Sequence, residues 1–230
     1  MKQERLNFYS IDMKYVRNLA KADDNVMSVS PQEHKQGRPF VGIIVMINNR
    51  QYCVPLTSPK PKFEKIKNSV DFLKIEHPTK TKDDGSHKII GGLNFNNMLP
   101  VSEIYLHKID VKITPKDNEK TKAYKELLRD QLEWCRSNDE KIIKKANNLY
   151  DLITKHADLN INLAKRCCKF QKLESILDKM IGKLDEKEEK IDNPNNQISP
   201  FRKMVESRLA AMNAPKKKSD VKSHENKKTR

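Results

Sequence analysis

The chain has 230 residues, and its 46 lysines and arginines against 31 aspartates and glutamates give a formal charge of +15. This length suits one domain with an extension, and the positive charge favours a polyanionic partner, nucleic acid before an anionic membrane. The longest uninterrupted apolar run, residues 40–47, is far shorter than the ~20 residues that span a bilayer. The N-terminus lacks a signal-peptide core, so we expect a cytoplasmic protein.

Short strand and helix patterns alternate at the start of the chain. Residues 7–11 predict a strand, and a short helix with Tyr15 on its apolar face follows it. Two apolar runs within residues 40–56, joined by a two-asparagine turn, predict a β-hairpin. Pro55 in the second run indicates an edge strand or a bulge, because proline donates no ladder hydrogen bond.

The period of the apolar positions changes along the rest of the chain. From Glu119 it changes from two to about 3.6, which predicts one long helix or two helices broken near Ser137. Between the hairpin and Glu119 we expect a helix at 64–68, strands at 71–75, 89–95 and 104–111, and a mobile charged loop at 78–87. Toward the C-terminus we expect further helices at 159–190 and 200–212. A disordered, lysine-rich tail is expected at 214–230.

The cysteines and histidines show no pattern of a disulfide, a catalytic thiol or a metal site. The four cysteines have no CxxC spacing, which fits a reducing compartment and inert thiols. The six histidines are scattered without the spacing of metal ligands or of an acid–base pair, so we expect neither a metal nor another cofactor. The four cysteines are Cys53, Cys135, Cys167 and Cys168.

The tetrad Thr57-Ser58-Pro59-Lys60 ends the second run of the hairpin and is the strongest candidate site. Ser58 and Lys60 each precede a proline, which pushes their backbone into an extended conformation. Residues two apart in an extended chain point to the same side, so the hydroxyl and the ammonium face one volume that could hold a phosphodiester. An ordinary turn at the end of a strand is the alternative.

Three further segments accompany the tetrad in a fixed order: Phe8 to Tyr15, Arg38 to Ile43 and Leu93 to Val101. Together the four segments resemble the ToxN/AbiQ family of endoribonuclease toxins from bacterial type III toxin–antitoxin systems. The resemblance covers about the first three quarters of the chain and fades after about residue 160.

This resemblance implies a fold class and a division of the chain. The expected fold is α+β, a compact and strongly bent antiparallel β-sheet, barrel-like and flanked by α-helices. We expect the endoribonuclease domain at residues 4–190, followed at 191–230 by a polar, lysine-rich extension that is partly helical and partly disordered.

The resemblance also implies an activity and its partners. It implies a metal-independent endoribonuclease that cuts adenine-rich RNA by attack of the ribose 2′-hydroxyl, leaving a 2′,3′-cyclic phosphate and a 5′-hydroxyl. The implied partners are target mRNA and a repeated pseudoknot antitoxin RNA, which the toxin processes and with which it forms a closed protein–RNA assembly. The implied role is abortive infection against phage, or plasmid maintenance.

Roles for the tetrad follow from this chemistry. Lys60 would stabilise charge on the phosphorane oxygens, and the hydroxyls of Thr57 and Ser58 would bond a non-bridging oxygen or the 2′-hydroxyl. Some family members have a histidine shortly after the tetrad, but Pro61 to Phe63 offers none. The identity of the general base therefore stays open.

Four other residues are expected to bind RNA. Tyr15 and Arg38 match family positions near the scissile phosphate, where Tyr15 would stack on a base or donate to phosphate and Arg38 would hold phosphate in bidentate fashion. A core tyrosine and a surface arginine are the alternatives. Lys62 and Lys65 would contact RNA beside the tetrad.

Two other function classes fit the same residues. A non-catalytic RNA-binding protein needs only the basic surface, with the tetrad as a turn. A serine–lysine amide hydrolase would use Ser58 as nucleophile and Lys60 as base, but no nucleophile-elbow glycines flank Ser58.

Overall fold

The structure, a computed structural model, describes residues 6–27 and 40–191. The chain divides into two compact units, Met1–Met180 and Ile181–Arg230. The helix Phe170–Ile191 begins in the first unit and ends in the second. Arg38, the expected last helix and the expected disordered tail lie outside the described residues.

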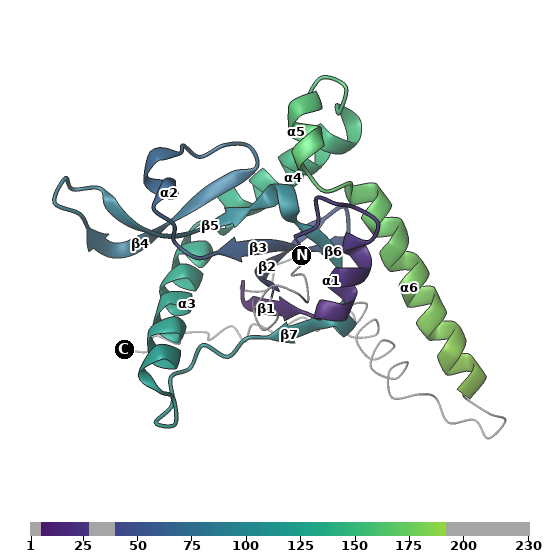
Figure 1. Ribbon diagram of the computed structural model, residues 1–230, viewed down its shortest axis with the longest axis horizontal. Helices are drawn as coiled ribbons and strands as arrows, with labels where there is room; N and C mark the ends of the chain where they lie inside the picture. The colour runs from purple at the N-terminus through teal and green to yellow at the C-terminus, as the bar shows by residue number, and fades with distance from the viewer. Residues whose placement is uncertain (1–5, 28–39, 192–230) are drawn as a thin grey trace, which may run out of the picture. The chain divides into compact units, whose positions relative to one another are not determined.

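An antiparallel sheet forms the centre of the first unit (Figure 1). Its strand order is β4-β5-β3-β2-β1-β7, and β6 pairs with β3 beside this path. The expected α+β fold with an antiparallel sheet is therefore confirmed, although the sheet stays open rather than closing into a barrel. The strands are β1 (Phe8–Ile11), β2 (Phe40–Ile47), β3 (Arg50–Thr57), β4 (Phe72–Thr81), β5 (His87–Asn94), β6 (Leu99–Val101) and β7 (Leu106–Lys108).

Helices flank this sheet. Helix α3 packs chiefly on β4, and α4 packs on β2. None of the helices within residues 6–27 and 40–191 has the length and apolar character needed to cross a bilayer. The helices are α1 (Met13–Ala20), α2 (Lys62–Lys65), α3 (Glu119–Ser137), α4 (Asp139–Lys155), α5 (Ile161–Arg166) and α6 (Phe170–Ile191), with 3₁₀ turns η1 (Phe95–Asn97) and η2 (Glu103–Tyr105).

Strand β3 connects the two parts of the sheet. One edge of it pairs with β2, and the other pairs first with β6 at residues 51–53 and then with β5 at residues 56–57. Pro55 lies where this second edge changes partner, so a missing backbone N–H is tolerated there. β3 is therefore an interior strand, and the expected edge position is wrong.

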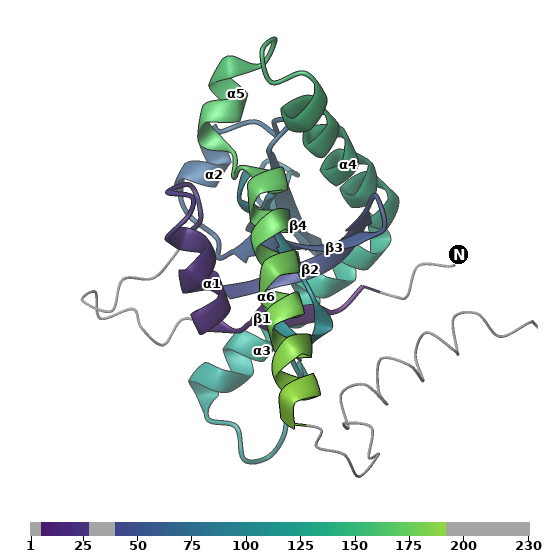
Figure 2. The ribbon, with the colours of Figure 1, turned by 90° about the vertical axis from the view of Figure 1, so that its right-hand side faces the viewer.

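The predicted hairpin between β2 and β3 is confirmed. Asn48 and Asn49 form its turn with positive φ angles of 48° and 63°, the conformation that a two-residue hairpin requires. Ile47 pairs with Arg50 directly across the turn. The break predicted near Ser137 is also confirmed, because α3 and α4 are separate helices on either side of Asn138 (Figure 2).

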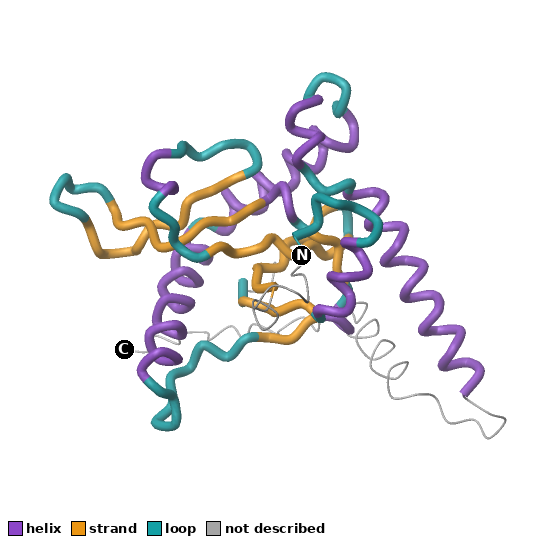
Figure 3. Tube along the Cα trace, in the orientation of Figure 1, coloured by secondary structure: helices purple, strands orange, loops and turns teal. Residues whose placement is uncertain are grey.

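Several expected boundaries were wrong, and in the β4–β5 segment the reason is that charged residues form strands by pairing with each other. Half of the residues expected in a mobile loop, 78–81 and 87, belong to β4 and β5, which form an arm extending past α2, and residues 82–86 form its turn (Figure 3). The helix expected at 64–68 is the earlier turn α2, and the strand expected at 104–111 is only η2 and β7. The helix expected at 159–190 is divided into α5 and α6.

Candidate active site at the end of strand β3

The tetrad leaves the sheet at the end of β3 and is anchored on both sides. Thr57 pairs with Gly92 of β5 as the last residue of the strand. After only four intervening residues α2 begins, and its Phe63 donates a backbone hydrogen bond to the Lys60 carbonyl at 2.9 Å. The Phe63 side chain is buried against Phe72, with 5.0 Å between ring centroids. The loop between these anchors is therefore short and fixed at both ends.

Ser58 and Lys60 lie on this loop and are exposed to solvent. Among the described residues, neither the Ser58 hydroxyl nor the Lys60 ammonium has a hydrogen-bond partner. Each of the two residues is followed by a proline, which restricts the backbone before it. Both groups are thus available to an external ligand. Lys60 is exposed and does not sit in an apolar pocket of the kind that a serine–lysine hydrolase needs.

Strand β5 closely approaches α3 and the end of β3 at Gly91. A Cβ atom at Gly91 would lie 2.5 Å from Gln131 Nε2 and 2.7 Å from the Thr57 carbonyl oxygen. Gln131 is buried and donates from Nε2 to the Ile90 carbonyl at 2.7 Å. The expectations from sequence did not include this support. The signal for it is Gly91-Gly92 within a strand pattern, which indicates a close backbone approach.

Two of the predicted RNA-binding residues lie directly after the loop. Lys62 and Lys65 are exposed at the first and last positions of α2. The carboxylate of Glu64 between them is paired with Lys82 from the end of the β4–β5 arm. The negative charge in α2 is thereby compensated, and the lysines make the surface beside Ser58 positive.

Tyr15 lies in the core rather than at the surface. Its side chain is 1% exposed, and its hydroxyl donates to the Pro100 carbonyl at 2.6 Å. Its ring stacks on Tyr105 with 4.2 Å between centroids. Burial, with a smaller contribution from Tyr105, raises the pKa of Tyr15 far above its usual value. This arrangement corresponds to the core-tyrosine alternative, in which Tyr15 connects α1 to β6.

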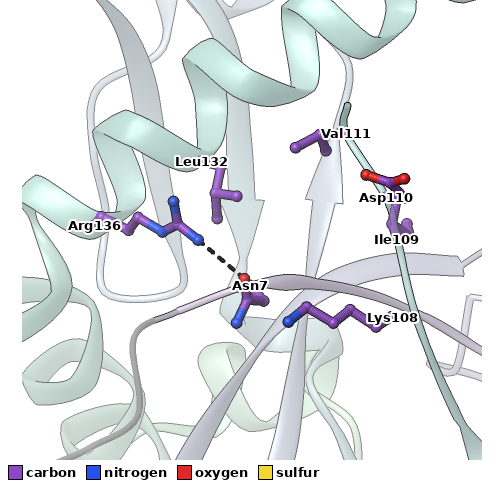
Figure 4. A pocket seen from close by; sticks show the side chains of 7 residues that line it. All are labelled: Asn7, Lys108, Ile109, Asp110, Val111, Leu132 and Arg136. Carbon is purple, nitrogen blue, oxygen red and sulfur yellow. Dashed lines mark hydrogen bonds between the residues drawn. The ribbon is translucent and has the colours of Figure 1, made fainter. Parts of the chain in front are cut away.

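A separate pocket of about 410 Å³ lies at the β7 end of the sheet, and no residue of the tetrad lines it (Figure 4). Arg136 spans it, donating to Asn7 Oδ1 at 2.9 Å and to the Leu6 carbonyl at 2.8 Å. These bonds tie α3 to the start of β1 and give the arginine a structural role. The lining residues are Asn7, Lys108, Ile109, Asp110, Val111, Leu132 and Arg136.

No group of three or more His, Cys, Asp or Glu side chains within the described ranges could hold a metal ion. All four cysteines are buried and unpaired. Burial raises the pKa of each of these thiols, so they stay protonated at neutral pH.

Sequence comparison relates the chain to a toxin family. The family model for toxin ToxN of type III toxin–antitoxin systems matches residues 7–178. The endoribonuclease ToxN of Pectobacterium atrosepticum is 28% identical over 149 residues, which cover 64% of this chain and 81% of that protein. The endoribonuclease ToxN of Bacillus thuringiensis subsp. kurstaki is 32% identical over 173 residues, which cover 73% of this chain and 80% of that protein.

Solved structures give the same relationship. One, from work on bacterial type III systems in which a non-coding RNA pseudoknot selectively inhibits the toxin, matches with a TM-score of 0.59 and 31% identity, over 77% of this chain and 98% of that one. AbiQ, a lactococcal anti-phage endoribonuclease, shares the fold with a TM-score of 0.61 at 22% identity, over the same 77% and 98%. The chain belongs to the ToxN family of endoribonuclease toxins from type III toxin–antitoxin systems.

Proposed function

We propose that this toxin cuts RNA by attack of a ribose 2′-hydroxyl on the adjacent phosphorus, at the loop that carries Ser58 and Lys60. The new bond joins the 2′-oxygen to phosphorus, and the bond to the 5′-oxygen breaks. The products are a 2′,3′-cyclic phosphate and a 5′-hydroxyl. The 2′-hydroxyl loses one proton and the leaving oxygen gains one, so the reaction has no net uptake of protons. Because the nucleophile belongs to the RNA, no covalent enzyme intermediate is needed.

The anchored, exposed loop is the observation that carries this proposal. Lys60 supplies positive charge to the phosphorane oxygens, and the hydroxyls of Ser58 and Thr57 bond a non-bridging oxygen or hold the 2′-hydroxyl in line. Removing one preorganised donor of this kind costs about 10² to 10³ in rate in enzymes that stabilise an oxyanion. The fixed ends of the loop support such preorganisation, since Thr57 is paired in the sheet and Phe63 is packed in the core.

The proposed partners are RNAs. One related structure concerns toxin inhibition by an RNA pseudoknot, and another, at 25% identity and a TM-score of 0.56, a processed non-coding RNA that regulates a bacterial antiviral system. We infer that a repeated pseudoknot RNA inhibits this chain by covering the Ser58 loop and is processed by it. The inhibited form is a closed protein–RNA assembly, and Lys62 and Lys65 contribute to binding.

The released toxin would cut adenine-rich sites in mRNA in the cytoplasm during phage infection or after plasmid loss. Residues 4–190 would form the nuclease domain, with 191–230 as the extension. The family match over residues 7–178 supports a nuclease domain that includes the tetrad. The formal charge of +15 supports a polyanionic partner.

The test is cleavage of a transcribed RNA with adenine-rich stretches by the purified chain and by Ser58→Ala and Lys60→Ala variants. We expect each variant to lose about 10² or more in rate, and the products to carry 5′-hydroxyls that a polynucleotide kinase labels without prior dephosphorylation. Ser175→Ala is the matched control, because Ser175 is an exposed serine on α6 whose hydroxyl bonds only the Gln171 carbonyl among the described residues. Full cleavage by Ser58→Ala would contradict the proposal and favour a binding role for the tetrad.

A further inference from the structure

Arg166, the last residue of α5, is held by a carboxylate that lies far from it in the sequence. Its Nε donates to Asp71 Oδ2 at 2.5 Å. The Asp71 side chain is 10% exposed, while that of Arg166 is 53% exposed. Asp71 Oδ1 also accepts from the Ser69 hydroxyl at 2.7 Å. One side of the guanidinium is thus fixed by a nearly buried anion, and the rest of it faces solvent.

The protonation state of Asp71 fits this holding role. Burial by itself would raise the pKa of Asp71, but the hydrogen bonds from Arg166 and Ser69 lower it below its usual value. The carboxylate is therefore charged at neutral pH. Because it binds only Nε, the two terminal nitrogens of Arg166 have no partner among the described residues. A guanidinium fork of this kind suits two oxygens of one phosphate.

A second cation approaches the same loop from α4. The Lys145 ammonium donates to the Ser69 carbonyl and lies 5.9 Å from the centroid of the Phe95 ring. Desolvation lowers the pKa of Lys145, and Asp71 opposes that shift. Two cations from different helices therefore meet at Ser69–Asp71, where α4, α5 and the loop after α2 come together (Figure 1).

Only a short, lysine-rich segment of chain separates this meeting point from the tetrad. The chain runs from Lys60 through α2 to Ser69 in nine residues and carries exposed lysines at positions 62, 65 and 67 on the way. An RNA strand that enters the Ser58 loop along these lysines would reach Arg166 and Lys145 with another of its phosphates.

We propose that Arg166, oriented by Asp71, and Lys145 form a phosphate-binding site for RNA that lies beyond the linkage cut at Ser58. The ligand is a phosphodiester of the same RNA strand, so the inference rests on the proposed function and extends its binding footprint. Asp71 acts as a positioning residue, because it touches the arginine and not the RNA.

Arg50 provides a matched control within the chain. It is also a partly exposed arginine, 40% by side chain, and it pairs with an aspartate from another element. Its two terminal nitrogens both bind Asp178, at 2.7 and 2.8 Å. Its fork is already filled, so its loss affects the fold and leaves phosphate binding unchanged.

The experiment measures binding of a single-stranded adenine-rich RNA in which every ribose carries a 2′-O-methyl group, so that no nucleophile is present. Fluorescence anisotropy gives Kd at several salt concentrations for the full chain and for Arg166→Gln, Lys145→Gln and Arg50→Gln. We expect Kd to rise about tenfold for each of the first two and the salt slope to fall by about 0.7 for each lost phosphate contact. Arg50→Gln should match the unmodified chain in both quantities.

Two further variants distinguish a loss of phosphate binding from a folding defect. Arg166→Lys keeps the charge and loses the fork, so it should bind more weakly than the unmodified chain and more tightly than Arg166→Gln. Asp71→Asn keeps both cations and releases the fork, so it should weaken binding while the circular dichroism spectrum stays native. Unchanged Kd and salt slope in Arg166→Gln, Arg166→Lys and Lys145→Gln would overturn the proposal, as would an equal loss in Arg50→Gln.

The failure of this site can be told apart from failure of the proposed function. If Ser58→Ala abolishes cleavage while Arg166→Gln and Lys145→Gln bind RNA normally, only the phosphate site is wrong. If Ser58→Ala cleaves at full rate, the proposed function is wrong whatever the binding data show. In steady-state cleavage, Arg166→Gln should raise KM with kcat within about twofold of the unmodified chain, the pattern of a contact made equally in ground and transition states.

Discussion

Gly91 and Gln131 fit against each other with no room for a methyl group between them. A Cβ atom at residue 91 would lie 2.5 Å from the Gln131 side-chain nitrogen, while the Thr57 carbonyl oxygen would lie 2.7 Å away. The backbone of β5 is therefore held between a buried amide of α3 and the last residue of β3. Through this contact, α3 supports the strand end from which the candidate catalytic loop departs.

Gly91→Ala should destabilise the fold and slow cleavage together. The added methyl group overpacks a site bounded by backbone and a buried amide, which costs about 1 to 3 kcal/mol. Urea unfolding and the rate of RNA cleavage measure the two effects. Gly182→Ala is the control and should change stability in the opposite direction, because nothing lies within 4 Å of its Cβ position in α6. It should stabilise the helix by about 0.5 to 1 kcal/mol. Equal stability of the two variants would contradict this account of Gly91.

Relaxing the loop backbone should lower kcat and leave RNA affinity nearly unchanged. Replacing Pro59 and Pro61 together by alanine frees the residues before them while the Ser58 hydroxyl and Lys60 ammonium remain. We expect kcat to fall about tenfold, because positioning rather than charge is lost. Single-turnover cleavage and anisotropy with uncleavable RNA separate the two quantities. Pro115→Ala, in an exposed turn, is the control. A change in Kd as large as that in kcat would argue against preorganisation.

Asp23→Ala should destabilise the protein through the start of α6. Asp23 is 3% exposed, and its carboxylate accepts from the backbone N–H groups of Lys169 at 2.5 Å and Asn25 at 3.1 Å. Removing a carboxylate that binds backbone N–H groups at a helix start costs about 1 to 2 kcal/mol. Denaturant unfolding measures the loss. The exposed neighbour Asp24 offers the control Asp24→Ala, for which we expect a change within about 0.5 kcal/mol.

The contribution of Asp71 to stability should depend on pH in the acid range. Its folded-state pKa is lowered by Arg166 and Ser69 against the raising effect of burial. The stabilisation is therefore complete above the unfolded-state value of about 3.9 and is lost as pH falls through the lower folded-state value. The difference in unfolding free energy between the unmodified chain and Asp71→Asn should be constant from about pH 5 to 7 and should shrink below about pH 4. A difference that stays constant down to pH 3 would mean that the carboxylate is not held in its charged form.

Local patterns in the sequence predicted elements whose cause is local. The two-asparagine turn predicted the β2–β3 hairpin, and the change of period predicted α3, α4 and the break at Asn138. Strands were predicted at the base of the β4–β5 arm, but its outer part within residues 78–87 was missed, because its residues are charged and its order comes from distant groups. His77 illustrates this, since its Nδ1 accepts backbone hydrogen bonds from Thr79 and Lys80 while its Nε2 lies 3.2 Å from Asp130 Oδ2 on α3.

In the candidate site, too, the features with a local cause were predicted and those that depend on distant residues were not. Ser58 and Lys60 could be singled out because two prolines mark them locally and four segments place them in a family. The contacts that support the site join residues far apart in the chain, such as Gln131 with Ile90 and Arg166 with Asp71. No spacing rule within one sequence indicates such pairs. Tyr15 had two sequence interpretations, and its 1% exposure agrees with the core position.

The four buried thiols allow local unfolding to be measured on the unmodified chain. Cys53 lies in β3, Cys135 in α3, and Cys167 and Cys168 in the link between α5 and α6, so the four thiols sample three parts of the fold. A protonated, inaccessible thiol reacts with an alkylating reagent only when its surroundings open. Peptide mapping after timed alkylation would therefore rank these three regions by how readily each exposes its interior, without any added label or mutation.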